Sequence, residues 1–180
     1  MDTNPQTFAT DRIENRKALL GSIDRVRNVL RSQCEVEERA ATLSSKTVAA
    51  LSDNGFLTMK LPAVLGGSEA DPITQFEVLE QLAGINASAS WCTMVGATAL
   101  GLPGAFLPDS GVAQMFGPAG APRGAICIMP AGKARPSDGG YSVSGRWSFA
   151  SGIRHSEWIT ALSSVVQDTE IQQELRMMVF

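Results

Sequence analysis

The chain changes its hydrophobic periodicity once, close to Arg123, and this change divides it into two unlike parts. Before that point apolar residues recur at helical spacing, as in the stripe Leu19, Ile23, Val26 and Leu30. After it, apolar and polar residues alternate with the period of a β-strand. The sequence therefore predicts an α+β chain, with a helical domain over residues 1–120 and a β-domain over residues 121–180.

Local signals predict where helices begin in the first part. A second helix is expected over residues 37–54. Asp71 followed by Pro72 is typical of a helix start, because Asp accepts the unpaired N–H groups and Pro fits the first turn. Asn86 or Ser88 is expected to open the next helix.

The second part reads as a meander of antiparallel strands. The apolar run 125–129 predicts a strand buried on both faces, and residues 141–149 alternate. Asp138-Gly139-Gly140 between them is typical of a hairpin turn. Further β-rich runs at 158–166 and 175–180 would leave an open sheet edge and an uncovered face. We therefore expect that the gene, or its ancestor, continues beyond Phe180.

Composition excludes several classes of protein. The chain is 44% hydrophobic and 18% charged, unlike a disordered chain, and its net charge of -3 argues against nucleic acid as a partner. No signal peptide and no membrane span are visible in the sequence. Three cysteines without CxxC spacing favour free thiols in a reducing cytoplasm.

Motifs for chemistry by side chains alone are missing. Gly132-Lys133-Ala134 lacks the remainder of a P-loop, and no GxGxxG is present. A single histidine, His155, cannot build a His-rich metal site, so no metal is expected, and a hydrogen-bonded position at a strand end is its simpler interpretation. Two classes of protein remain: a binding protein, and an enzyme whose cofactor performs the difficult chemical step.

Two stretches carry a family resemblance. Residues 139–152, GGYSVSGRWSFASG, and 155–158, HSEW, resemble the middle domain of the acyl-CoA dehydrogenase superfamily, closest to its flavin-dependent hydroxylase branch. Residues 51–56, with Leu61-Pro62 and Gly66-Gly67, resemble the family's N-terminal helical domain. The resemblance implies a helical domain followed by the first antiparallel strands of a β-barrel-like middle domain. The family's C-terminal four-helix bundle is absent.

The resemblance also implies a function. It suggests a flavin-dependent monooxygenase, with FAD or FMN, that acts on an aromatic or polycyclic small molecule through a flavin C4a-hydroperoxide. A separate flavin reductase would be a partner, and full-length relatives would be homotetramers. Since the main catalytic residues of the family lie in the bundle, this chain alone is expected to lack the complete active site. An acyl-CoA dehydrogenase acting on a thioester, or a non-catalytic domain, are the alternatives.

Cofactor-binding residues are implied at two places. The first is Phe149, Ala150, Ser151 and Gly152. An aromatic ring would face the flavin, and the hydroxyl of Ser151, the expected catalytic residue, would lie on the same side of the strand and bond flavin N5. The alternative is that Trp147 and Phe149 are core aromatics before a turn.

The second place is Met129, Pro130 and Gly132. The Glu-Pro and Gly-Ser-Asp signature of the dehydrogenases is missing there, which favours the hydroxylase branch. The resemblance further implies that one face of a helix borders the substrate, through Trp91, Met94, Val95 and Thr98. Ordinary helix packing is the alternative for these four residues.

Overall fold

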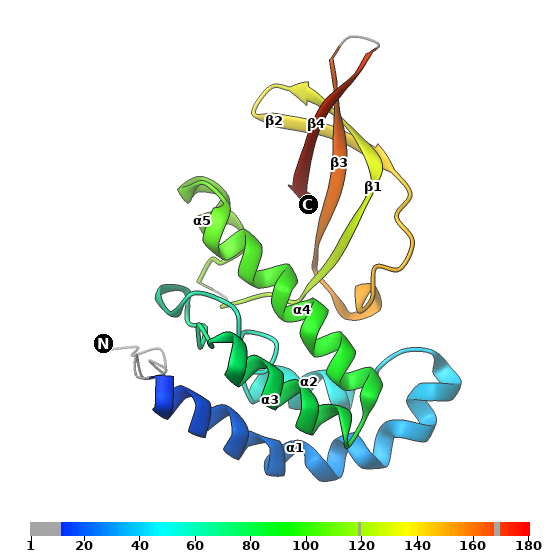
Figure 1. Ribbon diagram of the computed structural model, residues 1–180. Helices are drawn as coiled ribbons and strands as arrows, with labels where there is room; N and C mark the ends of the chain where they lie inside the picture. Colours follow the sequence, from blue (N-terminus) through cyan, green and yellow to red (C-terminus); the bar gives the residue numbers. More distant parts are fainter. Residues whose placement is uncertain (1–11, 119, 168–169) are drawn as a thin grey trace.

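The computed structural model describes residues 12–118, 120–167 and 170–180. A layer of helices lies beneath a twisted sheet (Figure 1). The helices are α1 (Arg12–Ala40), α2 (Ser45–Asp53), α3 (Pro72–Ala83), α4 (Ala87–Phe106) and α5 (Asp109–Met115), with short 3-10 helices at Ala63–Leu65 and Ile153–His155. The strands are β1 (Gly124–Ser137), β2 (Gly140–Gly145), β3 (Trp158–Gln167) and β4 (Glu170–Val179). No helical bundle follows the sheet in these residues.

The helix starts follow the local signals, with one exception. The side chain of Asp71 accepts from the N–H groups of Ile73 and Thr74, and that of Asn86 accepts from the N–H of Ala89, so both predicted starts are confirmed. The helix expected over residues 37–54 is wrong at its start, while its end is confirmed at Asn54, the C-cap of α2. Residues 37–40 belong to α1, and Ser44 caps a new helix by accepting from the N–H of Thr47.

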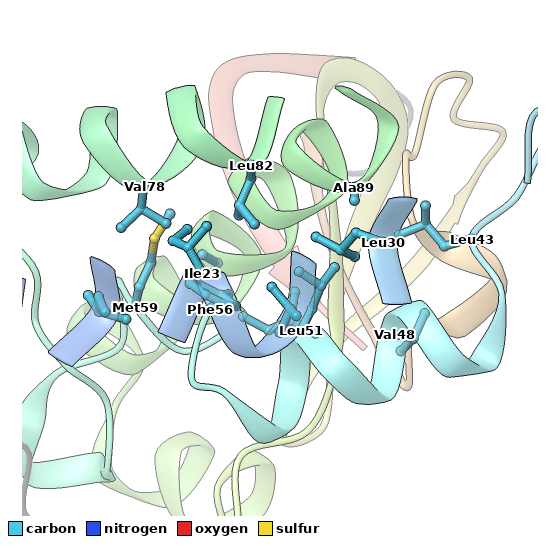
Figure 2. Packing of buried hydrophobic residues seen from close by; sticks show 14 of the residues in the cluster. Ile23, Leu30, Leu43, Val48, Leu51, Phe56, Met59, Val78, Leu82 and Ala89 are labelled. Atoms are coloured by element: carbon cyan, nitrogen blue, oxygen red, sulfur yellow. The ribbon is translucent and has the colours of Figure 1, made fainter. Parts of the chain in front are cut away.

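The predicted apolar stripe of α1 forms the centre of the helical layer. Leu19, Ile23, Val26 and Leu30 are almost completely buried. They pack with Leu51, Phe56, Val78 and Leu82 from the following segments (Figure 2). Each such side chain contributes about 1.5–3 kcal/mol through burial. Ala89 and Ala97 of α4 belong to this core, which fixes the position of the helix and leaves its other faces outside the core.

The sheet has the order β2-β1-β3-β4 and is mixed. The β1–β2 hairpin is antiparallel, as predicted, and turns at Gly139, which has φ +77°. β3 and β4 are also antiparallel, but β1 pairs with β3 in parallel, so the expected antiparallel meander is wrong at this pair. Parallel pairing requires a crossover, and residues 146–157 provide it by returning from β2 to the helical layer.

A large bulge interrupts β1. Its register with β3 jumps from Cys127–Ala161 to Gly132–Ser163, so several residues of β1 face a single position of β3. The run 125–129 was expected to be buried on both faces, but only its first three residues are buried, while Ile128 and Met129 are 70% and 62% exposed. The bulge turns these two side chains away from the sheet.

The strand expected over residues 141–149 ends early, at Gly145. Beyond it, Trp147 folds back over Gly132 and donates its indole N–H to the carbonyl oxygen of Leu162 over 3.0 Å. Its ring also lies against Phe180, with 5.8 Å between centroids. These contacts replace further ladder pairing, and Phe149 therefore lies in a loop outside the sheet.

Candidate functional site

The loop that follows Trp147 carries the first group of cofactor residues expected from the sequence. Phe149 has φ +61°, a left-handed conformation that is uncommon for a bulky residue, and its side chain is 94% exposed. The N–H of Ser151 donates to the carbonyl oxygen of Phe149 over 2.9 Å. The two side chains are therefore placed by a tight turn, and the expectation that they share one side of a strand is wrong.

Ser151 contacts the helical layer directly. The indole Nε1–H of Trp91, in the second turn of α4, donates to Ser151 Oγ over 3.0 Å. A hydroxyl has one hydrogen and two lone pairs, so this bond uses one acceptor position and leaves the Ser151 hydrogen available to a ligand. The structure thus joins a residue expected at the substrate to one expected at the flavin.

A cavity of about 700 Å³ opens beside this pair. It lies where the end of α1, the start of α4 and the loop 150–155 meet. Four of the residues singled out from the sequence line it: Trp91, Ala150, Ser151 and Gly152. The remaining expected residues lie outside it.

The second expected cofactor group lies in the bulge of β1, alongside the loop. Cys127 Sγ donates to the carbonyl oxygen of Ser148 over 3.3 Å at one end of the bulge. At the other end the ring of Trp147 covers Gly132 so closely that a Cβ on this glycine would overlap it. The segment that contains Met129 and Pro130 therefore lies beside residues 147–149. Both segments expose apolar side chains.

The expected substrate residues share one face of α4. Met94, Val95 and Thr98 follow Trp91 at positions i+3, i+4 and i+7 and are half-buried, while Trp91 is 55% exposed. None of the four belongs to the closed core. Thr98 Oγ1 accepts from Lys60 Nζ over 2.7 Å. Sequence reasoning missed Lys60, although a lysine within the apolar run LTMKLP was a visible signal.

Glu37 was also missed. It is buried, and its carboxylate accepts from the N–H of Ser44 and from Nδ2 of Asn86, both over 2.9 Å. Glu37 thereby ties α1 to the cap of α4, close to the cavity. Burial, and after it the charge of Glu37, raise the pKa of the Cys92 thiol, which keeps that thiol neutral. Glu37 lies seven residues after Leu30, on the apolar stripe, which could have revealed its burial.

His155 lines the cavity from the loop side. It belongs to a 3-10 helix rather than to a strand end, and its buried Nδ1 has no partner among the described residues. Burial, and after it the charge of Arg123, lower the pKa of His155. Arg123 itself pairs with Glu157 over 2.8 Å. The neutral imidazole thus faces the cavity as a hydrogen-bonding group rather than as a charge.

The arrangement fits a flat heteroaromatic cofactor such as a flavin. Exposed apolar side chains on the loop and on the bulge can cover a ring system, and the hydroxyl of Ser151 can bond a polar ring edge. It does not fit a metal ion, since no three His, Cys, Asp or Glu side chains cluster in the part of the chain that the structure describes. No helix of the same residues is long and apolar enough to cross a membrane.

Comparisons with known proteins agree with this fold. Residues 22–106 match the acyl-CoA dehydrogenase N-terminal domain. Over 153 residues the chain is 30% identical to HsaA of Mycobacterium tuberculosis, the oxygenase subunit of a flavin-dependent monooxygenase. The matched segment covers 84% of this chain and 38% of HsaA. Over 122 residues it is 34% identical to a pigment production hydroxylase of Rhodococcus erythropolis, covering 67% of this chain and 30% of that protein.

Solved structures point the same way. The crystal structure of HsaA superposes with a TM-score of 0.84 at 26% identity, over 91% of this chain and 44% of that one. XiaF from a Streptomyces species, solved with FADH2 and glycerol, superposes with a TM-score of 0.86 at 25% identity, over 93% of this chain and 42% of that one.

Residues 22–106 are therefore an acyl-CoA dehydrogenase N-terminal domain, and the chain has the fold of the acyl-CoA dehydrogenase superfamily. Within the superfamily it resembles the flavin-dependent monooxygenases, as the sequence predicted. The match to HsaA includes 84% of this chain but only 38% of the length of HsaA.

Proposed function

We propose that this chain supplies the flavin-contacting loop and one wall of the substrate site of a flavin-dependent monooxygenase that hydroxylates an aromatic compound. Reduced FAD or FMN would come from a separate reductase. The names of the relatives support this division of labour: one is the oxygenase component of an FADH2-dependent resorcinol hydroxylase from a Rhizobium species, and HsaA is an oxygenase subunit. The three free thiols fit a reducing cytoplasm.

The observation that carries the proposal is the state of Phe149. Phe149 combines a backbone with φ +61°, which is unfavourable for a bulky residue, with an apolar side chain that is 94% exposed and so open to a ligand. Strained residues of this kind gather at ligand sites. Two residues further on, Ser151 Oγ accepts from the indole N–H of Trp91, so a ring that covers Phe149 would lie close to a hydroxyl in a fixed position.

Each residue then has a defined part. Phe149 and Met129 offer apolar surface to the isoalloxazine, while Ala150 and Gly152 leave room for the ring to approach the backbone. The hydroxyl oxygen of Ser151, which keeps a second lone pair beside its bond to Trp91, would accept from the N5–H of the reduced flavin. Trp91, Met94 and Val95 exclude water from the side where the substrate lies. A bound, reduced flavin would supply the chemistry by which molecular oxygen is activated.

The test is a two-dimensional NMR titration of the isotope-labelled 180-residue chain with reduced FAD and reduced FMN under anaerobic conditions. Weak binding suffices, because exchange-averaged shifts map the contact. Shifts are expected in residues 128–132 and 149–152 and in the indole N–H of Trp91. Phe149→Ala should weaken them, whereas Phe106→Ala should not; Phe106 is also a largely exposed phenylalanine and lies at the end of α4. Shifts that avoid both segments would refute the proposal.

A further inference from the structure

Lys60 holds an ammonium group in a fixed place on α4. Its Nζ donates to Thr98 Oγ1 over 2.7 Å, and Thr98 Oγ1 in turn donates to the carbonyl oxygen of Met94 over 2.8 Å. The threonine hydrogen is therefore committed to the helix, and its oxygen faces the lysine as an acceptor. Since an ammonium has three N–H donors, further donors remain for a ligand.

Packing restrains the lysine side chain. Lys60 lies between Met59 and Leu61, which are both completely buried, and is itself half-buried. A Cβ on Gly101 of α4 would lie 2.9 Å from Lys60 Cβ, so the lysine stem crosses the helix at a glycine. A lysine held in this way has already lost much of the conformational entropy that an exposed lysine loses on binding.

This ammonium has no acidic partner among the residues that the structure describes. In the described parts of the chain, none of the ion pairs includes Lys60. Burial alone lowers its pKa, without any contribution from a neighbouring charge. A half-buried cation without a counter-charge is unfavourable for folding, and an anion that binds to it offsets that loss.

The position of Lys60 connects it to the substrate wall. Thr98 lies on the α4 face of Trp91, two helical turns and about 10 Å further along the axis. Met94 and Val95 lie between them on the same face, half-buried. The face therefore has the Trp91–Ser151 pair at one end, an apolar middle, and a cation at the other end.

We propose that Lys60, anchored by Thr98, binds an acidic oxygen of the substrate, so that the site accepts an aromatic compound that carries a carboxylate or a phenolate. The aromatic ring lies over Met94 and Val95. This inference rests on the proposed function, whose substrate class it narrows. Lys60 is a specificity residue in this scheme, and Thr98 positions it.

The test uses the same NMR titration with small probes in place of flavin. Benzoate supplies the carboxylate, nitrophenolate supplies the phenolate, and benzamide is the neutral match of benzoate. Benzoate or nitrophenolate is expected to shift the amide signals of Lys60 and Thr98, and benzamide to bind at least about tenfold more weakly, as for the loss of a charge-assisted bond. Whichever anion binds better identifies the source of the acidic oxygen. Absence of binding by both anions overturns the proposal.

Variants assign the effect to the ammonium. Lys60→Met keeps an unbranched apolar stem and should weaken anion binding about tenfold. Lys46→Met is the matched control, because Lys46 is exposed on α2 and its loss changes the net charge equally. Unchanged affinity in Lys60→Met, or an equal loss in Lys46→Met, overturns the proposal. If Lys60→Met does not fold, Thr98→Val decides: a loss of about threefold supports the anchoring role and unchanged affinity refutes it.

The two proposals fail separately. Anion binding at Lys60 without flavin shifts in residues 149–152 rejects the flavin site and leaves the anion site. Flavin shifts without anion binding reject the role of Lys60 and leave the flavin site. Both titrations use the same labelled chain under the same conditions.

Discussion

The indole N–H of Trp91 donates to Ser151 Oγ over 3.0 Å, across sixty positions of sequence separation. This bond joins α4 to the loop after β2, and so joins the expected substrate wall to the expected flavin loop. It also occupies one of the two acceptor positions of the serine hydroxyl. Two residues singled out for separate roles are therefore neighbours, and a change at one is expected to be felt at the other.

Ser151→Ala removes the acceptor of that bond. Because both side chains are partly exposed, water can replace the serine, and the expected loss of stability is about 1 kcal/mol or less. The indole N–H signal of Trp91 should shift, while those of Trp147 and Trp158 should stay. Ser144→Ala on β2 is the matched control. An unmoved Trp91 signal in Ser151→Ala would contradict the contact.

Gly132→Ala should disrupt the sheet. An added Cβ would overlap the ring of Trp147 and the hydroxyl oxygen of Ser163, and neither can move without loss of buried contacts. We expect a loss of about 3 kcal/mol in the free energy of unfolding, at the upper end for overpacking, measured by urea denaturation. Gly140→Ala is the control, since nothing lies within 4 Å of its added Cβ. Equal midpoints for the two variants would count against this packing.

Glu37→Gln should loosen the start of α4. The carboxylate accepts from Ser44 and from Asn86, and an amide retains only one oxygen for both donors. An unpaired buried donor reduces stability by about 1–3 kcal/mol. Glu38→Gln, at the exposed neighbouring position, should unfold at the wild-type urea concentration. The idea fails if both variants unfold together.

Lys60 should titrate below the ordinary lysine value of 10.5, because burial lowers its pKa. The unfolded chain then holds this proton more tightly than the folded chain does. Stability consequently rises with pH between the folded pKa and 10.5, and Lys60→Met should remove that rise. NMR of isotopically methylated lysines measures the titration directly. Saturating benzoate should move the Lys60 transition upward, and a Lys60 transition at or above 10.5 without benzoate would disprove the burial effect.

Local features were predictable because neighbours in the sequence decide them. Asp71 and Asn86 cap helices through bonds to N–H groups two or three residues away, and Gly139 turns a hairpin between adjacent strands. The buried stripe of α1 follows from helical spacing alone. The family resemblance, carried by short contiguous motifs, was equally accessible, and the comparisons confirm it.

What only the tertiary structure decided depends on residues far apart in the chain. β2 ends before Trp147 because the Trp147 ring packs on Gly132 and its indole N–H donates to the carbonyl oxygen of Leu162. Phe149 consequently lies outside the sheet. The parallel pairing of β1 with β3, the burial of Glu37, and the contacts of Trp91 with Ser151 and of Lys60 with Thr98 arise in the same way. The sequence by itself determined the order of helices and strands and the family. Which polar groups meet at the site was settled by long-range packing and hydrogen bonding, for which sequence periodicity holds no signal.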